Sequence, residues 1–198
     1  MSLLISGFET EAFSTWRTLH ENECILICLI KYGEPVFKEY YKHITYALAY
    51  RGQIHSKEQT DKIFENIKKE MKEHDLKSKD MKKFIEYGYL YSVPNVVINE
   101  DFKLNFRDGL EKQAGLSAYN ERYEMSSEII HSTPILIYSS KEYYYYMTLL
   151  SLYESFFRLE KVFLVLFANT VSEEDMKKYE ALKKIYYVQL MNIHKREA

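Results

Sequence analysis

Two stretches of the sequence place polar side chains on helix faces that otherwise carry apolar residues, and these side chains are the first candidates for binding or catalysis. In the first stretch, Arg17 and Glu21 lie four residues apart and continue a stripe formed by Cys24 and Cys28. The segment 25–30 is apolar on every side, so this stripe is expected to face a protein core. One interpretation is an ordinary ion pair, which contributes roughly 0.3–0.5 kcal/mol when exposed. The other is an interior pair whose guanidinium holds a carboxylate or an anionic ligand in bidentate geometry.

The second stretch carries hydrogen-bonding side chains at every fourth residue, namely Tyr119, Tyr123, Ser127 and His131. On a helix, such a row faces one neighbouring element. One interpretation is a set of structural hydrogen bonds that fix how two helices pack. The other is functional: His131, near the helix end that Pro134 marks, points into a cavity where an imidazole can transfer protons or bind a ligand.

Metal binding is the third chemistry that the spacing of ligand-type residues suggests. Glu128 and His131 form a Glu-x-x-His pair, the spacing found in di-iron carboxylate bundles. Such sites need a second pair of this kind and two further glutamates, whereas Glu39–His43 and Glu70–His74 are one residue too long. The sequence therefore predicts no cofactor, and Glu128 with His131 are its remaining metal candidates.

Glycine, proline and capping residues indicate where the helices that carry these side chains begin and end. A helix over 9–32 is expected to end at Gly33, and the short gap to the next helix predicts an antiparallel hairpin. Ser56 with Gln59, and Ser139 with Glu142, form capping-box patterns at helix starts. The expected helices cover 9–32, 35–50, 56–74, 78–88, 106–114, 117–132, 139–169 and a last segment that begins after Ser172.

The expected fold is all-α: a single domain over residues 1–198, built as a multi-helix bundle. With 6 Gly and 3 Pro in 198 residues, the chain has too few turn residues for a many-stranded β fold. The segment 139–169 is apolar on nearly every face. It is therefore expected to be a long central hydrophobic helix near the C-terminus.

Charge and hydropathy exclude several classes of protein. Lysine and arginine number 27 against 29 acidic residues, a balance that argues against a protein built to coat nucleic acid. No signal peptide is recognised, and Cys24 and Cys28 are expected to be buried, reduced thiols. The longest apolar stretch, 143–168, is not expected to span a membrane because four charges interrupt it: Glu154, Arg158, Glu160 and Lys161. We therefore expect a soluble, cytoplasmic protein.

The two motif-bearing stretches together resemble a mainly bacterial, all-helical family of unknown function and are DUF5677-like. The resemblance rests on Trp16-Arg17-Thr18-Leu19-His20-Glu21 and on Tyr123-x-x-x-Ser127-x-x-x-His131-Ser132. It extends from about Gly7 to Phe167. It implies a helical bundle with a polar site formed by two helices, and no established activity. The site residues that it implies are Arg17, Glu21, Tyr123, Ser127 and His131.

A second comparison is with HEPN-type helical domains, some of which are ribonucleases. Those enzymes use an arginine followed by a histidine after four to six residues. In this chain Arg51 and His55 have three residues between them, and Arg122 and His131 have eight. The ribonuclease spacing is not met, although a similar helical bundle is still compatible with the sequence.

These observations favour a binding or interaction module over an enzyme. The module is expected to bind a protein partner or a small ligand, and apolar surface on several helices predicts a homodimer. The alternative is a hydrolase or HEPN-like ribonuclease. In it His131 would act as general acid or base, Arg17 would hold an anionic group, and Glu21 would orient one of them.

Overall fold

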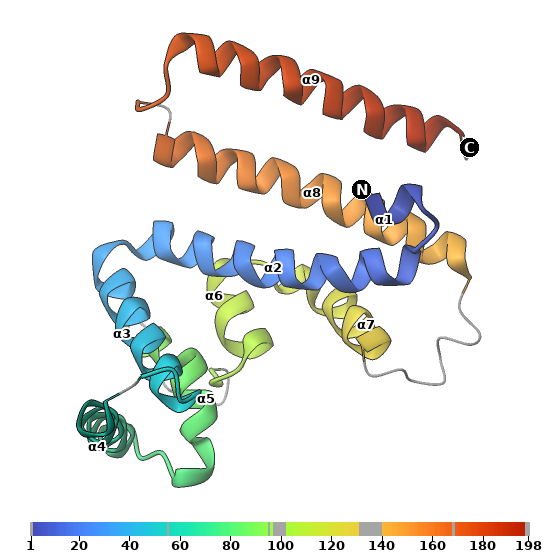
Figure 1. Ribbon diagram of the computed structural model, residues 1–198. Helices are drawn as coiled ribbons and strands as arrows, with labels where there is room; N and C mark the ends of the chain where they lie inside the picture. The colour runs from blue at the N-terminus through green and yellow to red at the C-terminus, as the bar shows by residue number, and fades with distance from the viewer. Residues whose placement is uncertain are drawn as a thin grey trace. The chain divides into compact units, whose positions relative to one another are not determined.

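A computed structural model describes residues 2–54, 56–94, 96, 102–130, 140–167 and 169–196, and all regular structure among them is helical (Figure 1). The expected all-α fold class is therefore confirmed. By its internal contacts the chain divides into two compact units, one formed by 1–23 with 121–198 and the other by 24–120. The division falls within α2 (Glu9–Tyr32). The single domain expected from the sequence stays a prediction.

The unit formed by residues 24–120 packs two longer helices against a series of short ones. The helices α3 (Glu34–Tyr50) and α4 (Lys57–Glu73) start where their capping residues predict, and the amide of Gln59 donates to the Ser56 hydroxyl at 3.4 Å. Apolar side chains from α3, α4 and α5 form the core between them: Tyr46, Ile67, Met71, Phe84 and Ile85. The short elements are η1 (Ser78–Asp80), α5 (Met81–Tyr87), η2 (Gly88–Ser92), the π-helical η3 (Phe106–Glu111), α6 (Lys112–Ala114) and η4 (Ser117–Tyr119).

The two cysteines lie in this unit and are buried as thiols, with no bond between them. Loss of solvent raises the pKa of the Cys28 thiol to about 12, so it carries its proton at neutral pH. Their expected state, buried and reduced, agrees with the structure.

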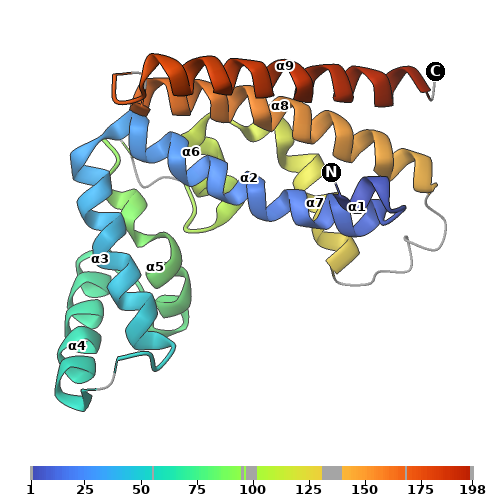
Figure 2. The same cartoon turned by 45° about the horizontal axis from the view of Figure 1, so that its top comes forward.

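The other unit contains α1 (Ser2–Ile5), the first half of α2, α7 (Asn120–Ile130), α8 (Lys141–Phe167) and α9 (Glu173–Arg196). The helices α8 and α9 run side by side in both views (Figures 1 and 2), and Lys183 of α9 pairs with Glu160 of α8. Ser172 caps α9 by accepting a hydrogen bond of 3.1 Å from the amide of Asp175. In the core of this unit, the rings of Phe13 and Trp16 stack 5.6 Å apart.

The expectation of a long central hydrophobic helix is not confirmed for α8. Its fully buried residues all lie between Tyr144 and Ser155, and four of the five carry hydroxyl groups: Tyr144, Thr148, Leu149, Ser151 and Ser155. Toward its C-terminal end, Val165 is 71% exposed and Phe167 is 45% exposed. High hydropathy indicates what a helix could bury, but it does not show which turns meet a neighbour.

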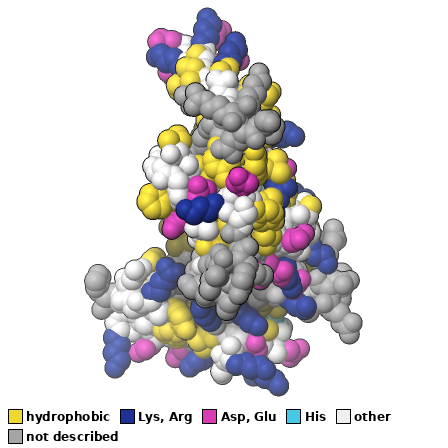
Figure 3. Space-filling model, turned by 90° about the vertical axis from the view of Figure 1, so that its right-hand side faces the viewer, with side chains coloured by type: hydrophobic (Ala, Val, Ile, Leu, Met, Phe, Trp, Pro, Cys, Tyr) yellow, Lys and Arg dark blue, Asp and Glu magenta, His cyan; other side chains and the backbone are white. Residues whose placement is uncertain are grey.

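The length and apolarity of the described helices and the charge on one face of the surface bear on the expectations from composition. No helix there has both the length and the apolarity needed to cross a membrane. On the face drawn in Figure 3, the described basic and acidic side chains alternate, with apolar side chains between them. That face carries no extended patch of a single sign, in agreement with the balanced composition.

Candidate functional site

Four of the five predicted site residues meet where the first half of α2 packs against α7. The Nε of Arg17 donates to Oε1 of Glu21 at 3.1 Å, across one turn of α2. From α7, the hydroxyl of Tyr123 donates to the same oxygen at 2.6 Å. The Nη1 of Arg17 reaches the Ser127 hydroxyl at 3.3 Å. We call these four residues the arginine cluster.

Protonation within the arginine cluster follows from burial and from these contacts. The Arg17 guanidinium lies 4.7 Å from the centre of the Tyr123 ring, in cation–π geometry. Burial alone would lower the pKa of Arg17, but the contacts with Tyr123 and Glu21 outweigh it and raise that pKa. The pKa of Tyr123 is also raised, first by burial and then by its hydrogen bond to Glu21. At neutral pH Arg17 therefore carries its positive charge and Tyr123 keeps its proton.

The arginine cluster lies at the edge of the core and keeps hydrogen-bonding capacity for a further molecule. The side chain of Arg17 is 25% exposed and that of Glu21 is 36% exposed. A guanidinium has five N–H groups, and among the residues that the structure describes, Glu21 and Ser127 accept from two of them. The bonds from Arg17 and Tyr123 to Glu21 both end on Oε1, so they leave the second carboxylate oxygen to other donors.

A second polar group, which is fully buried, involves Glu23 on α2, two residues after Glu21. The sequence did not predict it as part of the site. Glu23 is 0% exposed and is paired with Arg158 of α8 through both Nε and Nη2, the latter at 3.0 Å. The Ser155 hydroxyl donates to Oε2 of Glu23 at 3.1 Å and accepts a bond of 3.2 Å from Nε1 of Trp16. This bidentate pair joins α2 to α8 in the interior.

His20 connects the buried pair to the arginine cluster. It is fully buried, its ring stacks on Trp16 at 5.0 Å, and its Nδ1 lies 3.6 Å from Oε2 of Glu23. On its other side, its ring centre is 6.3 Å from that of Tyr123. Burial alone would raise the pKa of Glu23, but its contacts with His20, Arg158 and Ser155 outweigh that effect and lower the pKa. Glu23 is therefore ionised at neutral pH, although no water reaches it.

The sequence contained a signal for this buried pair. Arg158 is one of four charges within the apolar stretch 143–168, and a charge on a largely apolar helix needs a partner or solvent. The partner itself could not be identified from the sequence, because Glu23 lies 135 positions away and follows a polar run.

Two of the remaining predicted residues lie outside the described part of the chain, and two lie within it. His131 and Ser132 lie outside the described residues, so the catalytic role of His131 stays a prediction, as does the enzyme alternative that depends on it. Glu128 is exposed on α7, and its pairing with His131 as metal ligands also stays a prediction. Tyr119, the first member of the row, is half-buried in η4.

Comparison with known proteins gives one match. The family described as "Family of unknown function (DUF5677)" matches residues 1–142, a range that includes the whole arginine cluster. No curated protein and no solved structure matches the chain.

Proposed function

Because the chain belongs to DUF5677, a family of unknown function, we propose its role from the geometry of the site. The protein acts as a helical binding module, and the arginine cluster of Arg17, Glu21, Tyr123 and Ser127 holds an anionic group of its ligand. That group belongs either to a small molecule or to a protein partner.

One observation carries this proposal: Arg17 is held by side chains from two helices and is still partly open to solvent. Glu21 and Ser127 fix the plane of the guanidinium, and the Tyr123 ring lies against its face. An arginine that is positioned before binding loses less side-chain entropy when it binds an anion. An arginine that only stabilised the fold would not need to keep donors at the surface.

The carboxylate of Glu21 restricts which anions suit the cluster. A ligand with negative charge alone would be repelled by Glu21, which lies next to the guanidinium. A ligand that carries a hydrogen-bond donor beside its anionic group can bond to Arg17 and to the second oxygen of Glu21 together. The singly charged form of inorganic phosphate has both features and is therefore a suitable probe.

Binding of inorganic phosphate in slightly acidic buffer, measured by calorimetry, tests the proposal. We expect Arg17→Lys to weaken binding about tenfold or more, because a lysine keeps the charge but loses the planar fork, and tenfold corresponds to about 1.4 kcal/mol. The matched control is Arg51→Lys, at an exposed arginine that ends α3, for which we expect unchanged affinity. Equal affinity of the parent and Arg17→Lys, or no binding by the parent, would contradict the proposal.

The setting that the sequence predicts forms part of the same proposal: the bacterial cytoplasm, with the protein present as a homodimer. Buried cysteine thiols suit a reducing compartment. Apolar side chains that a second copy could cover are exposed on α9, where Leu182 is 65%, Ile185 56% and Val188 54% exposed.

Light scattering on the purified protein measures this association. We expect a mass of two chains that falls to one chain in the variant Leu182→Glu with Ile185→Glu, because charges in an apolar interface oppose its formation. A single-chain mass for the parent at every concentration would rule out the homodimer.

A further inference from the structure

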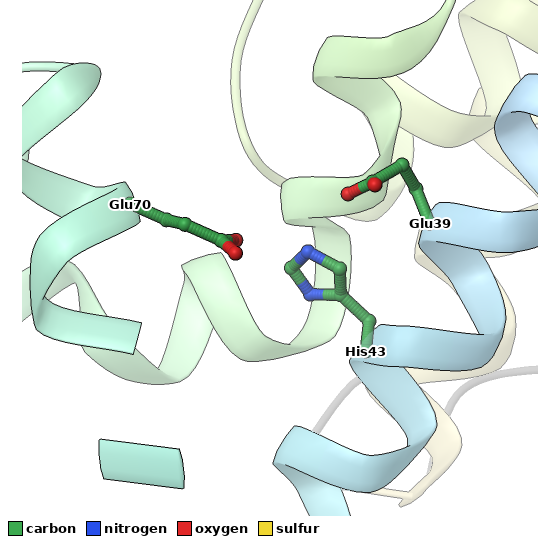
Figure 4. A group of neighbouring side chains, drawn as sticks. All are labelled: Glu39, His43 and Glu70. Carbon is green, nitrogen blue, oxygen red and sulfur yellow. The ribbon is translucent and has the colours of Figure 1, made fainter. Parts of the chain in front are cut away.

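Three side chains of metal-ligand type meet in the unit formed by residues 24–120, separate from the arginine cluster. Glu39 and His43 lie one turn apart on α3, and Glu70 comes from α4. One ligand atom from each lies within 4.8 Å of the other two. Figure 4 shows the imidazole of His43 between the two carboxylates.

The protein holds the His43 ring in an orientation that suits a ligand. The side chain is 4% exposed, and its Nδ1 lies 3.1 Å from the carbonyl oxygen of Ile85. A carbonyl can only accept, so Nδ1 carries the proton and the lone pair is on Nε2. Metal-binding histidines are commonly fixed by such a bond from their other nitrogen. No described residue forms a hydrogen bond with Nε2.

The surroundings of the ring also fix its position. The rings of Tyr46 and Phe84 each approach it edge-on at 5.1 Å. Gly88 lies close to the ring, because an added Cβ there would be 2.5 Å from Cε1 of His43.

A cation already lies between the two carboxylates in the structure. The ammonium group of Lys42 is 2.5 Å from Glu39 and 3.0 Å from Glu70, and the Tyr46 hydroxyl donates to Glu70 at 2.7 Å. The Lys42 side chain is 34% exposed, so it can turn to solvent without unfolding the helix. The two carboxylates therefore attract positive charge, and a divalent ion would compete with Lys42 for them.

We propose that Glu39, His43 and Glu70 form a site for a divalent transition-metal ion of the zinc class, and that Lys42 occupies the site in the absence of metal. One imidazole nitrogen and two carboxylate oxygens suit Zn²⁺, which takes such ligands at about 2.0–2.2 Å. Two ligand atoms of one ion are then at most about 4.4 Å apart, so small rotations of the glutamates bring all three into range. Three protein ligands leave a fourth position for water or a substrate.

Equilibrium dialysis of the full chain against Zn²⁺ tests the site. We expect one ion per chain, and at least tenfold weaker binding by Glu39→Gln, by Glu70→Gln and by His43→Gln. We expect Lys42→Met to bind Zn²⁺ more tightly, by about tenfold, because it removes the competing ammonium. The matched control is Lys38→Met, which breaks the exposed pair with Glu34 on the same helix and should leave the affinity unchanged.

Three outcomes would overturn the proposal. The first is the absence of saturable binding at one ion per chain. The second is binding that both glutamate variants leave unchanged, since these half-buried carboxylates can be replaced even if His43→Gln fails to fold. Substitution with Co²⁺ gives an independent readout: a thiolate-to-metal absorption band would place the ion at Cys24 and Cys28 and contradict the assignment.

Discussion

Replacing Arg158 by methionine should lower the free energy of unfolding by about 3–5 kcal/mol. The variant leaves the ionised Glu23 in the core with Ser155 and His20 as its remaining neighbours. Glu23 is 0% exposed, so water cannot replace the lost guanidinium. The bidentate pair also joins α2 to α8, which together position the face of α2 that carries Arg17. Loss of the pair should therefore affect the arginine cluster as well as stability.

Urea unfolding followed by the fluorescence of Trp16 measures this effect. Trp16 is the only tryptophan in the chain, is 1% exposed, and bonds to Ser155 beside the buried pair. The control is Arg122→Met, which breaks the bond of Arg122 to Glu154 between α7 and α8. Those side chains are 22% and 30% exposed, so we expect a cost of about 1 kcal/mol or less. If Arg158→Met and Arg122→Met lower the free energy of unfolding by similar amounts, the buried pair of Glu23 and Arg158 does not stabilise the protein more than an exposed pair does.

Gly109→Ala should destabilise the unit of residues 24–120 by about 2–3 kcal/mol. A Cβ at this buried position would lie 2.4 Å from the carbonyl oxygen of Lys103 and 3.2 Å from the Leu90 side chain. The first contact is with the backbone, which cannot rotate away as a flexible side chain can. At a helix position where nothing lies near the added Cβ, a change from glycine to alanine would instead stabilise the helix by up to about 1 kcal/mol. The sign of the effect therefore depends on the contact with Lys103.

Hydrogen exchange of the amides in η3 and α6, together with unfolding followed by circular dichroism, measures this change. We expect faster exchange in these two elements and a lower unfolding midpoint for Gly109→Ala. A variant that is as stable as the parent, or more stable, would mean that η3 does not lie against Lys103 as described.

Much of the helix pattern could be predicted from the sequence because its signals are local. Gly33 predicts the end of α2, and Ser56 predicts the start of α4, since a cap acts on the adjoining turn alone. The π-helical hydrogen bonding of η3 was not predicted, because it results from packing that the residues 106–111 do not encode on their own.

The arginine cluster could be predicted because spacing on each helix places its members on a single face. Arg17 and Glu21 pair across a turn, and Tyr123 and Ser127 face them with the same separation. The pairing of Glu23 with Arg158 depends on contact between distant segments, which spacing on one helix does not reveal. The spacing of Glu39 and His43 is one residue too long for the Glu-x-x-His pattern, and their third neighbour, Glu70, comes from another helix. Spacing on one helix therefore does not predict this group of three.

The most direct test of the binding proposal follows the Nε–H signal of Arg17 by NMR while inorganic phosphate is added. The signal is assigned by its loss in Arg17→Lys. We predict that it shifts and saturates at the same phosphate concentration as the calorimetric binding. If phosphate binds while the Arg17 signal stays in place, the anion lies elsewhere and the proposed role of the arginine cluster is wrong.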